Sequence, residues 1–279
     1  MNTTCGQDIM HRCSESGMHG KVALVTGSSD ENGIGIAIAT SLARRGCSVV
    51  LTGSRNPEKA ETLRSKLERQ FNVQVLYFAA NFEKLEEIER LYDDVIKCHP
   101  EGVDILVNNA GYMYCKSVES MDMDQWEKSL RINVTAPCNL TKLTLPKMRS
   151  KGWGRIINIS SISGLSGFAD LGAYVSSKHA LCGLTKTVAM ETIGTGITCN
   201  AICPAEVLTE LNMKLAQGTY GKEGMTLNEY KKTAVPQANP SGRFVETGQV
   251  AELVIFLCSS AADQMTGTNI PMDAGHQAQ

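Results

Sequence analysis

The 279-residue sequence has no long apolar run and no block of like charge. No stretch approaches the roughly 18 consecutive apolar residues that a membrane-spanning helix needs, and residues 1–20 lack the apolar segment of a secretory signal. Lysine and arginine number 27 against 29 aspartates and glutamates, for a formal net charge of −2. We therefore expect no nucleic-acid or membrane partner, because no basic surface or apolar span is available, and we expect a small-molecule partner.

The ten cysteines lack a recognisable pattern. They fall at irregular spacings, with no CxxC pair and no histidine cluster at ligand distance, so the sequence predicts no metal site. Thiols scattered through a chain of this length are typical of a reducing compartment. We expect a cytoplasmic protein whose cysteines fill its core as small apolar residues.

The sequence does contain a regular alternation of short apolar segments and helical patterns from Lys21 onward. Strands are expected at KVALVTG, CSVVLTG, VQVLYFAAN, VDILVNNAG, GRIINISS and TCNAICP, and helices near 34–45, 57–70, 83–98, 124–150, 174–192 and 247–259. The strands are nearly continuous in Val, Ile and Leu, as in parallel strands that are covered on both faces. The order predicts a single α/β domain over 21–275 with a doubly wound parallel sheet, the Rossmann fold.

Two segments fall outside this alternation. Residues 1–20 are polar and are expected to form a disordered tail. Residues 206–246 combine closely spaced glycines with an amphipathic helical pattern, which is typical of a mobile flap. Ligands of open α/β sheets bind beyond the carboxyl ends of the strands, so a flap after the strand ending at Cys203 would cover such a ligand.

A glycine-containing loop follows the first strand directly, in TGSSDENGIGIAIA at 26–39. Three glycines there would allow a tight turn and a close approach of the backbone to a phosphate: Gly27, Gly33 and Gly35. The loop also carries Asp30 and Glu31, whose charges would repel a dinucleotide pyrophosphate. We expect this acidic pair to bulge outward into water through a turn with positive φ at Asn32 and Gly33.

Four further residues suggest proton chemistry. Tyr174 and Lys178 are four positions apart in AYVSSK and are therefore neighbours on one helix face. A nearby ammonium favours the phenolate, and lowering a tyrosine pKa by about three pH units requires roughly 4 kcal/mol. Ser161 follows a predicted strand end, where it could bond a substrate oxygen. Asn133 falls inside a long predicted helix, where a short amide is a mediocre helix former, so we expect a buried polar role.

These motifs together resemble the short-chain dehydrogenase/reductase family over residues 20–275. The matching segments are TG with GIG at 26–35, NNAG at 108–111, YxxxK at 174–178, and ICP at 202–204 followed by Thr209. The resemblance implies an oxidoreductase with a catalytic tetrad: Asn133, Ser161, Tyr174 and Lys178. In this tetrad the tyrosine exchanges the hydroxyl proton and the lysine lowers its pKa and binds the nicotinamide ribose. The serine positions the carbonyl, and the asparagine holds a water linked to the lysine. A homotetramer built through 124–150 and 174–192 is also implied.

Within the family the chain is similar to bacterial-type 3-hydroxybutyrate dehydrogenases, through GRIINISS, AYVSSKHALCGLTK, AMETIGTGITCNAICP and MTGTNIPMDAG. Those enzymes grip the substrate carboxylate with polar or basic side chains. The implied substrate-binding positions here are Met113, Ser161, Ser163, Leu171, Tyr174 and Leu215. A carboxylate buried among mainly apolar residues would lack a partner, so we expect a less anionic ketone or secondary alcohol. Two alternatives stay open: a 3-hydroxybutyrate dehydrogenase whose clamp comes from a flap lysine, and a non-catalytic nicotinamide-binding sensor or scaffold.

The cofactor contacts are also implied by the resemblance. They are Gly27, Gly33, Ile34, Gly35, Ser54, Arg55, Asn81, Asn109, Ala110, Gly111, Tyr174, Lys178, Pro204, Val207 and Thr209. The choice between NAD and NADP stays open. The second strand ends in LTGSRNPEK, without the acid that would bond the ribose 2'-hydroxyl of NAD, and Ser54 and Arg55 are available for a 2'-phosphate. However, the similar 3-hydroxybutyrate dehydrogenases use NAD without an acid there.

Overall fold

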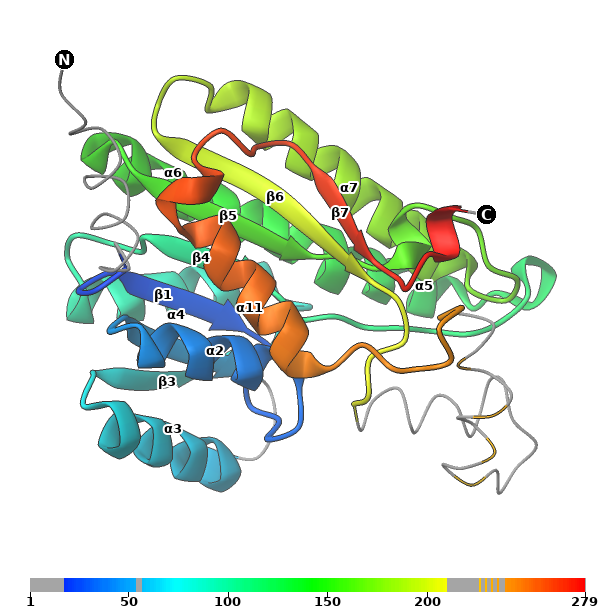
Figure 1. Ribbon diagram of the computed structural model, residues 1–279, viewed down its shortest axis with the longest axis horizontal. Helices are drawn as coiled ribbons and strands as arrows, with labels where there is room; N and C mark the ends of the chain where they lie inside the picture. Colours follow the sequence, from blue (N-terminus) through cyan, green and yellow to red (C-terminus); the bar gives the residue numbers. More distant parts are fainter. Residues whose placement is uncertain are drawn as a thin grey trace, which may run out of the picture.

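The computed structural model describes residues 18–53, 57–209 and 239–278, together with Thr226, Glu229, Lys232 and Val235. Its centre is a seven-stranded parallel sheet in the order β3-β2-β1-β4-β5-β6-β7, with helices on both faces (Figure 1). The predicted doubly wound α/β fold in one domain is therefore confirmed.

Six of the seven strands were predicted from their apolar runs, and the seventh was missed. They are β1 (Val22–Thr26), β2 (Ser48–Gly53), β3 (Val75–Ala79), β4 (Ile105–Asn108), β5 (Gly154–Ile159), β6 (Ile197–Pro204) and β7 (Asn269–Met272). Strand β7 contains Pro271, which has no backbone N–H and argues against a strand in the sequence. Among the described strands β7 ends the sheet order and pairs with β6 alone, where Cys203 is opposite Pro271. Proline is tolerated at such an edge.

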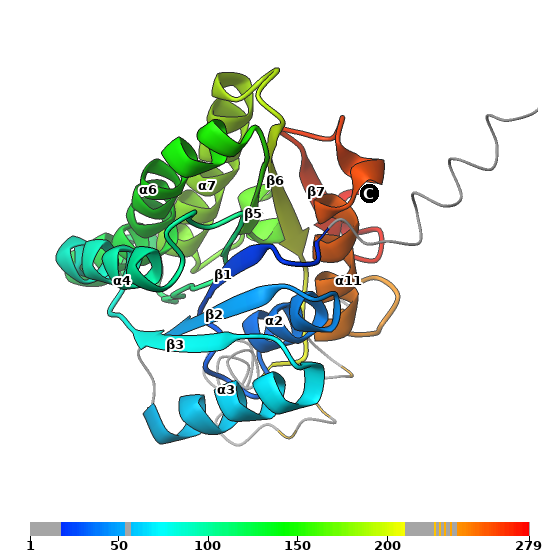
Figure 2. The same cartoon turned by 90° about the vertical axis from the view of Figure 1, so that its left-hand side faces the viewer.

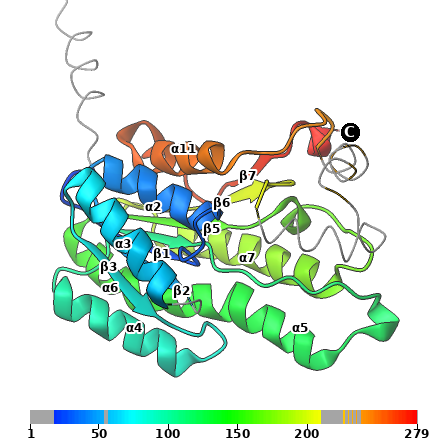
Figure 3. The same cartoon turned by 90° about the horizontal axis from the view of Figure 1, so that it is seen from below.

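The helices form two layers. Helices α2 (Ile34–Arg44), α3 (Pro57–Phe71) and α11 (Thr247–Cys258) cover one face of the sheet (Figure 2). The other face carries α4 (Leu85–Cys98), α5 (Met123–Leu130), α6 (Ala136–Lys151) and α7 (Gly172–Glu191), as Figure 3 shows from below. The long helix expected at 124–150 is α5 and α6 joined by a π-helical turn, η2 (Arg131–Thr135).

The sheet is buried on both faces, which explains its apolar strands. Along β1, Ala23 and Val25 belong to the cluster that includes residues of α2 and α11. Val22 and Leu24 belong to the cluster that includes residues of α4 and α6. Fully burying a valine or leucine side chain contributes about 1.5–3 kcal/mol to the stability of the fold. A polar residue on either face of β1 would therefore disrupt the packing of the helices against that face.

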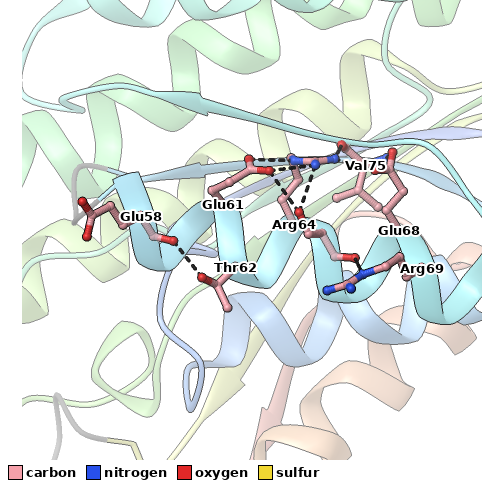
Figure 4. Close-up of polar contacts among 8 residues, drawn as sticks. Glu58, Glu61, Thr62, Arg64, Glu68, Arg69 and Val75 are labelled. Atoms are coloured by element: carbon pink, nitrogen blue, oxygen red, sulfur yellow. Dashed lines mark hydrogen bonds and ion pairs between the residues drawn. The ribbon is translucent and has the colours of Figure 1, made fainter.

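Arg64 attaches helix α3 to strand β3 (Figure 4). Its guanidinium donates to Glu61 at 2.8 Å and Glu68 at 2.7 Å on the same helix, and to the carbonyl of Val75 at 3.0 Å. These charge-assisted bonds raise the pKa of Arg64 and lower the pKa of both carboxyls. The bond to Val75 holds the first residue of β3 against the helix, and Asn81 follows two residues after the end of this strand.

Candidate active site

A cavity of about 420 Å³ opens at the carboxyl ends of the strands. It spans the junction between β1 and β4, where the order of the strands reverses, and open α/β sheets bind ligands at such a switch point. Its lining includes one residue at or after the end of each of six strands: Asn81, Gly53, Gly27, Asn109, Ser160 and Pro204.

Most of the expected site residues within the described ranges line this one cavity. They are Gly27, Gly33, Ile34, Asn81, Asn109, Ala110, Gly111, Met113, Ser161, Ser163, Leu171, Tyr174, Lys178, Pro204, Val207 and Thr209. Gly35 and Asn133 are not among the lining residues. Gly35 packs against Gly27, and Asn133 is hydrogen-bonded to Tyr112, and both of these partners line the cavity. Ser54, Arg55 and Leu215, and most of the expected flap, lie outside the described residues.

The glycine loop is built by close packing of backbone. Gly27 has a φ of +63°, and a Cβ on it would lie 2.9 Å from the Cα of Ala110. A Cβ on Gly35 would lie 2.4 Å from the carbonyl oxygen of Gly27, so glycine alone lets α2 start this close to β1. Asn109 donates to the carbonyls of Thr26 and Gly27 at 2.8 and 3.0 Å. The loop is therefore a fixed backbone cradle of the kind that fits a pyrophosphate.

Only Glu31 of the acidic pair in this loop faces water as expected, and the turn differs from the expected one. Gly33 has a φ of −83°, and Asn32 is not among the residues with positive φ. Asp30 makes the turn instead: its carbonyl accepts the N–H of Gly33 at 3.0 Å, and its Oδ1 accepts the N–H of Asn32 at 3.2 Å. Such an Asx turn reverses the chain without positive φ and draws the carboxylate back toward the loop. Asp30 is half-buried and lines the cavity, so the prediction was wrong for Asp30, while Glu31 is exposed as predicted.

Tyr174 and Lys178 lie on α7, with Nζ of the lysine 5.5 Å from the centre of the tyrosine ring. Lys178 is 3% exposed, and its Nζ donates to the carbonyl of Ile159 at the end of β5 at 2.9 Å. Burial lowers the pKa of Lys178 to about 8. Ser161 follows the same strand, and its hydroxyl accepts the N–H of Ser163 at 3.1 Å. Strand β5 and helix α7 therefore bring the expected serine, tyrosine and lysine together.

The phenol of Tyr174 is held in its protonated form. Burial raises the pKa of Tyr174 to about 12, a hydrogen bond with Ser161 lowers it in part, and the charge of Glu206 raises it again. This direction is opposite to the lowering that the sequence suggested, because desolvation outweighs the hydrogen bond with Ser161. A neutral phenol at the cavity wall is a proton donor, so the site as built is suited to protonating an oxygen.

Asn133 is fully buried in the π-helical turn η2. Its Oδ1 accepts the N–H of Tyr112 at 2.8 Å, and its Nδ2 donates to the carbonyl of Tyr112 at 2.7 Å and to the hydroxyl of Ser177 at 2.9 Å. The buried polar position expected for this amide is confirmed. Single π-helical turns occur frequently at functional sites, and here the turn fixes the backbone next to Gly111. A Cβ on Gly111 would lie 3.8 Å from Nζ of Lys178, so this backbone borders the lysine.

Several lining residues were not found from the sequence. Phe168 and Tyr112 lie outside any recognised motif, whereas Glu206 is two residues after the ICP segment, where its position was a usable signal. Lys128 also lines the cavity, forms an ion pair with Glu83 at 2.8 Å, and lies 4.9 Å over the ring of Tyr112. The cavity is therefore more polar at its edges than the predicted substrate residues indicated.

In the described part of the chain, no helix is long and apolar enough to cross a membrane. The same residues include no group of three or more His, Cys, Asp or Glu side chains that could hold a metal ion.

Comparison with known proteins agrees with this site. The family model described as short chain dehydrogenase matches residues 21–219, and the chain belongs to this family. It is 39% identical over 265 residues to a D-beta-hydroxybutyrate dehydrogenase of Cupriavidus necator, covering 94% of this chain and 100% of that protein. A protein of the same name from Rhizobium meliloti is 37% identical, with 93% and 99% covered. The solved L-sorbose reductase of Gluconobacter frateurii, complexed with NADPH and L-sorbose, has a TM-score of 0.88 and 30% identity, with 95% and 99% covered.

The protein is an oxidoreductase that transfers a hydride between NAD or NADP and a secondary alcohol or ketone. The prediction of an enzyme is thereby confirmed over that of a non-catalytic sensor. The described residues fit such a cofactor. A side chain at Gly27 or Gly35 would clash with neighbouring backbone, so glycine at both positions allows the close backbone packing that forms the cradle. Gly27 and Tyr174 line the same cavity.

Proposed function

We propose that this enzyme interconverts a neutral ketone and its secondary alcohol. The observation that carries the proposal is the lining of the cavity near Tyr174, where Met113, Phe168 and Leu171 are apolar. Among the described lining residues the basic side chains are Lys178, which is bonded to the carbonyl of Ile159, and Lys128, which is paired with Glu83. A substrate carboxylate would lose its hydration here without gaining a partner, whereas an apolar substituent gains about 25 cal/mol for each Å² that it buries.

In the proposed reduction, Tyr174 gives its phenolic proton to the carbonyl oxygen. A bound nicotinamide cofactor would supply the hydride that the carbonyl carbon needs. Ser161 donates a hydrogen bond to the same oxygen and positions it. Lys178, held on the carbonyl of Ile159, stabilises the phenolate that remains. Asn133 acts as a positioning residue, because it fixes the backbone of Tyr112 beside the lysine. The reverse reaction uses the same groups, with the phenolate as the base.

The cofactor would be held along the rest of the cavity. The backbone of Gly27, Gly33 and Ile34 would hold the pyrophosphate, Asn81 and Asn109–Gly111 would border the adenosine, and Pro204–Thr209 would border the carboxamide. We further propose that NADP is preferred. The segment after β2 has no acid until Glu58 and offers Ser54 and Arg55 to a 2'-phosphate. Support comes from the similar L-sorbose reductase, which was solved with NADPH. Comparison of kcat/KM with NADPH and NADH, before and after Arg55→Ala, tests this preference.

The substrate proposal is tested with acetoacetate, its methyl ester and a neutral ketone of similar length, each with both reduced cofactors. We expect the neutral compounds to exceed acetoacetate in kcat/KM by tenfold or more, which corresponds to about 1.4 kcal/mol. The identity of 39% to a D-beta-hydroxybutyrate dehydrogenase supports a second candidate, oxidation of 3-hydroxybutyrate. Preference for acetoacetate would establish that candidate and would require a basic group from the segment between 210 and 238.

We also propose that the protein is a cytoplasmic homotetramer. Met123 on α5 and Met190 on α7 are 60% and 70% exposed, and Ile193 just after α7 is 63% exposed. These exposed apolar side chains are available for contacts through α5 and α7, the helices through which the family resemblance implies assembly. Light scattering coupled to gel filtration measures the assembly, and Met190→Glu should dissociate it if α7 forms the contact. Cell fractionation tests the location.

A further inference from the structure

Glu206 is a carboxylate in the cavity that the proposed proton transfer does not use. It lies directly after β6, is half-buried, and lines the cavity together with Tyr174 and the apolar residues near it. Its negative charge is one of the causes that raise the pKa of Tyr174. An ionic group bound next to the reacting carbonyl would therefore also lie within reach of the charge on Glu206.

The backbone of Glu206 is fixed from two directions. Asn239 is fully buried, its Oδ1 accepts the N–H of Glu206 at 2.9 Å, and its Nδ2 donates to the carbonyl of Glu206 at 3.1 Å. The N–H of Val245 donates to the same carbonyl at 2.9 Å, and Ala205 donates to Met272 in β7 at 3.1 Å. Because these bonds join the main chain of Glu206, the substitution Glu206→Gln leaves them in place.

Glu206 differs from the other charged side chains of the cavity in its effect on Tyr174. The charged side chains among the described lining residues are Asp30, Glu83, Lys128, Lys178 and Glu206. Asp30 lies in the glycine loop, and Glu83 is paired with Lys128 at 2.8 Å. Besides Glu206, the groups whose charge raises the pKa of Tyr174 are the thiols Cys203 and Cys115. Of the described carboxylates that line the cavity, only Glu206 acts on the tyrosine in this way.

We propose that Glu206 determines the substrate charge that the enzyme accepts, disfavouring an anionic group beside the carbonyl and favouring a cationic one such as a quaternary ammonium. This inference rests on the proposed function, because it concerns the ketone bound at Tyr174. Like charges in a partly desolvated cavity repel more strongly than in water, and opposite charges attract more strongly. Glu206 would act on substrate selection and not on the transfer of the proton itself.

The test uses three ketones that share the acetonyl group and differ in charge: acetoacetate, 4,4-dimethyl-2-pentanone and acetonyltrimethylammonium. The second and third compounds have the same shape, since a quaternary carbon replaces the ammonium nitrogen. Values of kcat/KM are measured for the wild type, for Glu206→Gln and for Glu31→Gln, which removes the same charge from an exposed position. Binding of the three compounds to the enzyme with reduced cofactor is measured by calorimetry, so that the ratios do not depend on turnover.

We expect Glu206→Gln to raise the ratio of anion to neutral ketone about tenfold and to lower the ratio of cation to neutral ketone by a similar factor, as expected for loss of one close charge. Glu31→Gln should change neither ratio by more than about twofold. In the same variant the rise of alcohol oxidation with pH should move to lower pH, because the charge that raises the pKa of Tyr174 is gone. Unchanged ratios in both binding and turnover would overturn the inference. Turnover of acetoacetate in preference to the neutral ketone by the wild type would instead contradict the proposed function.

Discussion

The cofactor end of the cavity is formed mainly by backbone, and the substrate end is formed mainly by side chains. At the cofactor end, backbone packs on backbone. A Cβ on Gly35 would lie only 2.4 Å from the carbonyl oxygen of Gly27. Asn109 donates hydrogen bonds to two carbonyls of the loop. At the substrate end, the wall consists of side chains, among them Met113, Phe168 and Glu206.

This difference separates what the fold requires from what it leaves free. A side chain at Gly35 would displace the first helix, so the residue there is dictated by the fold of the cradle. A change at Met113 or Glu206 alters the shape or charge of the cavity and leaves the backbone bonds in place. We therefore expect mutations at one end to change cofactor binding and mutations at the other end to change turnover and substrate choice.

The largest effect is expected for Tyr174→Phe. Removal of the hydroxyl should lower kcat at least a thousandfold, about 4 kcal/mol in the activation barrier, while cofactor affinity stays within a few-fold. Steady-state assays give kcat, and fluorescence titration gives the Kd of the cofactor. Tyr112→Phe is the matched control, since Tyr112 also lines the cavity but its hydroxyl is bonded to Gln125. Retention of more than a tenth of kcat in Tyr174→Phe would remove the tyrosine from the mechanism.

Asn133→Ala should destabilise the backbone beside the cavity at Tyr112. It removes three hydrogen bonds and leaves the N–H and carbonyl of Tyr112 without their partner, at an expected cost of about 2–3 kcal/mol in the free energy of unfolding. Urea denaturation measures this loss. Asn139→Ala is the control, because the buried Nδ2 of Asn139 has no hydrogen-bond partner among the described residues. Equal losses in the two variants would show that Asn133 has no special structural role.

Gly35→Ala tests the cofactor end. The added methyl group must push the start of α2 away from Gly27, and we expect the Kd of the cofactor to rise about tenfold or more, because helix and loop backbone together bind the pyrophosphate. Gly248→Ala in α11 is the control, since a Cβ at Gly248 meets no atom within 4 Å. If Gly35→Ala changed kcat for the bound ternary complex and left the Kd unchanged, the distinction between the two ends would not hold.

The sequence predicted most of what depends on repeated patterns. Six strands, six helical segments and the convergence of Tyr174, Lys178 and Ser161 followed from apolar periodicity and from known motifs. Strand β7 was missed because Pro271 suppresses the strand pattern, and edge position, which permits the proline, is a property of the sheet. The direction of the Tyr174 pKa was also missed, because desolvation depends on three-dimensional burial. Glu206 was missed although it lies two residues after the ICP segment, because that motif marks the position and does not specify an acid there.

The turn at Asp30 shows the same limit on a smaller scale. The sequence indicated a turn, but it could not distinguish a positive φ at Asn32 from an Asx turn in which the side chain of Asp30 accepts the N–H of Asn32 at 3.2 Å. Both geometries are compatible with Asp-Glu-Asn-Gly, and they place the Asp30 carboxylate in different surroundings.

The smallest predicted effect compares the two acids of this loop. Asp30→Asn keeps Oδ1 as an acceptor for Asn32 and removes a negative charge from the cavity wall, so cofactor affinity should increase about two- to fivefold. Glu31→Gln removes the same charge from an exposed position, where screening should hold the change below about 1.5-fold. Titrations at low and high salt distinguish the electrostatic part, because the gain in Asp30→Asn should shrink as salt rises. If the two variants behaved alike, Asp30 would be as well solvated as Glu31, and its position on the cavity wall would have no electrostatic consequence.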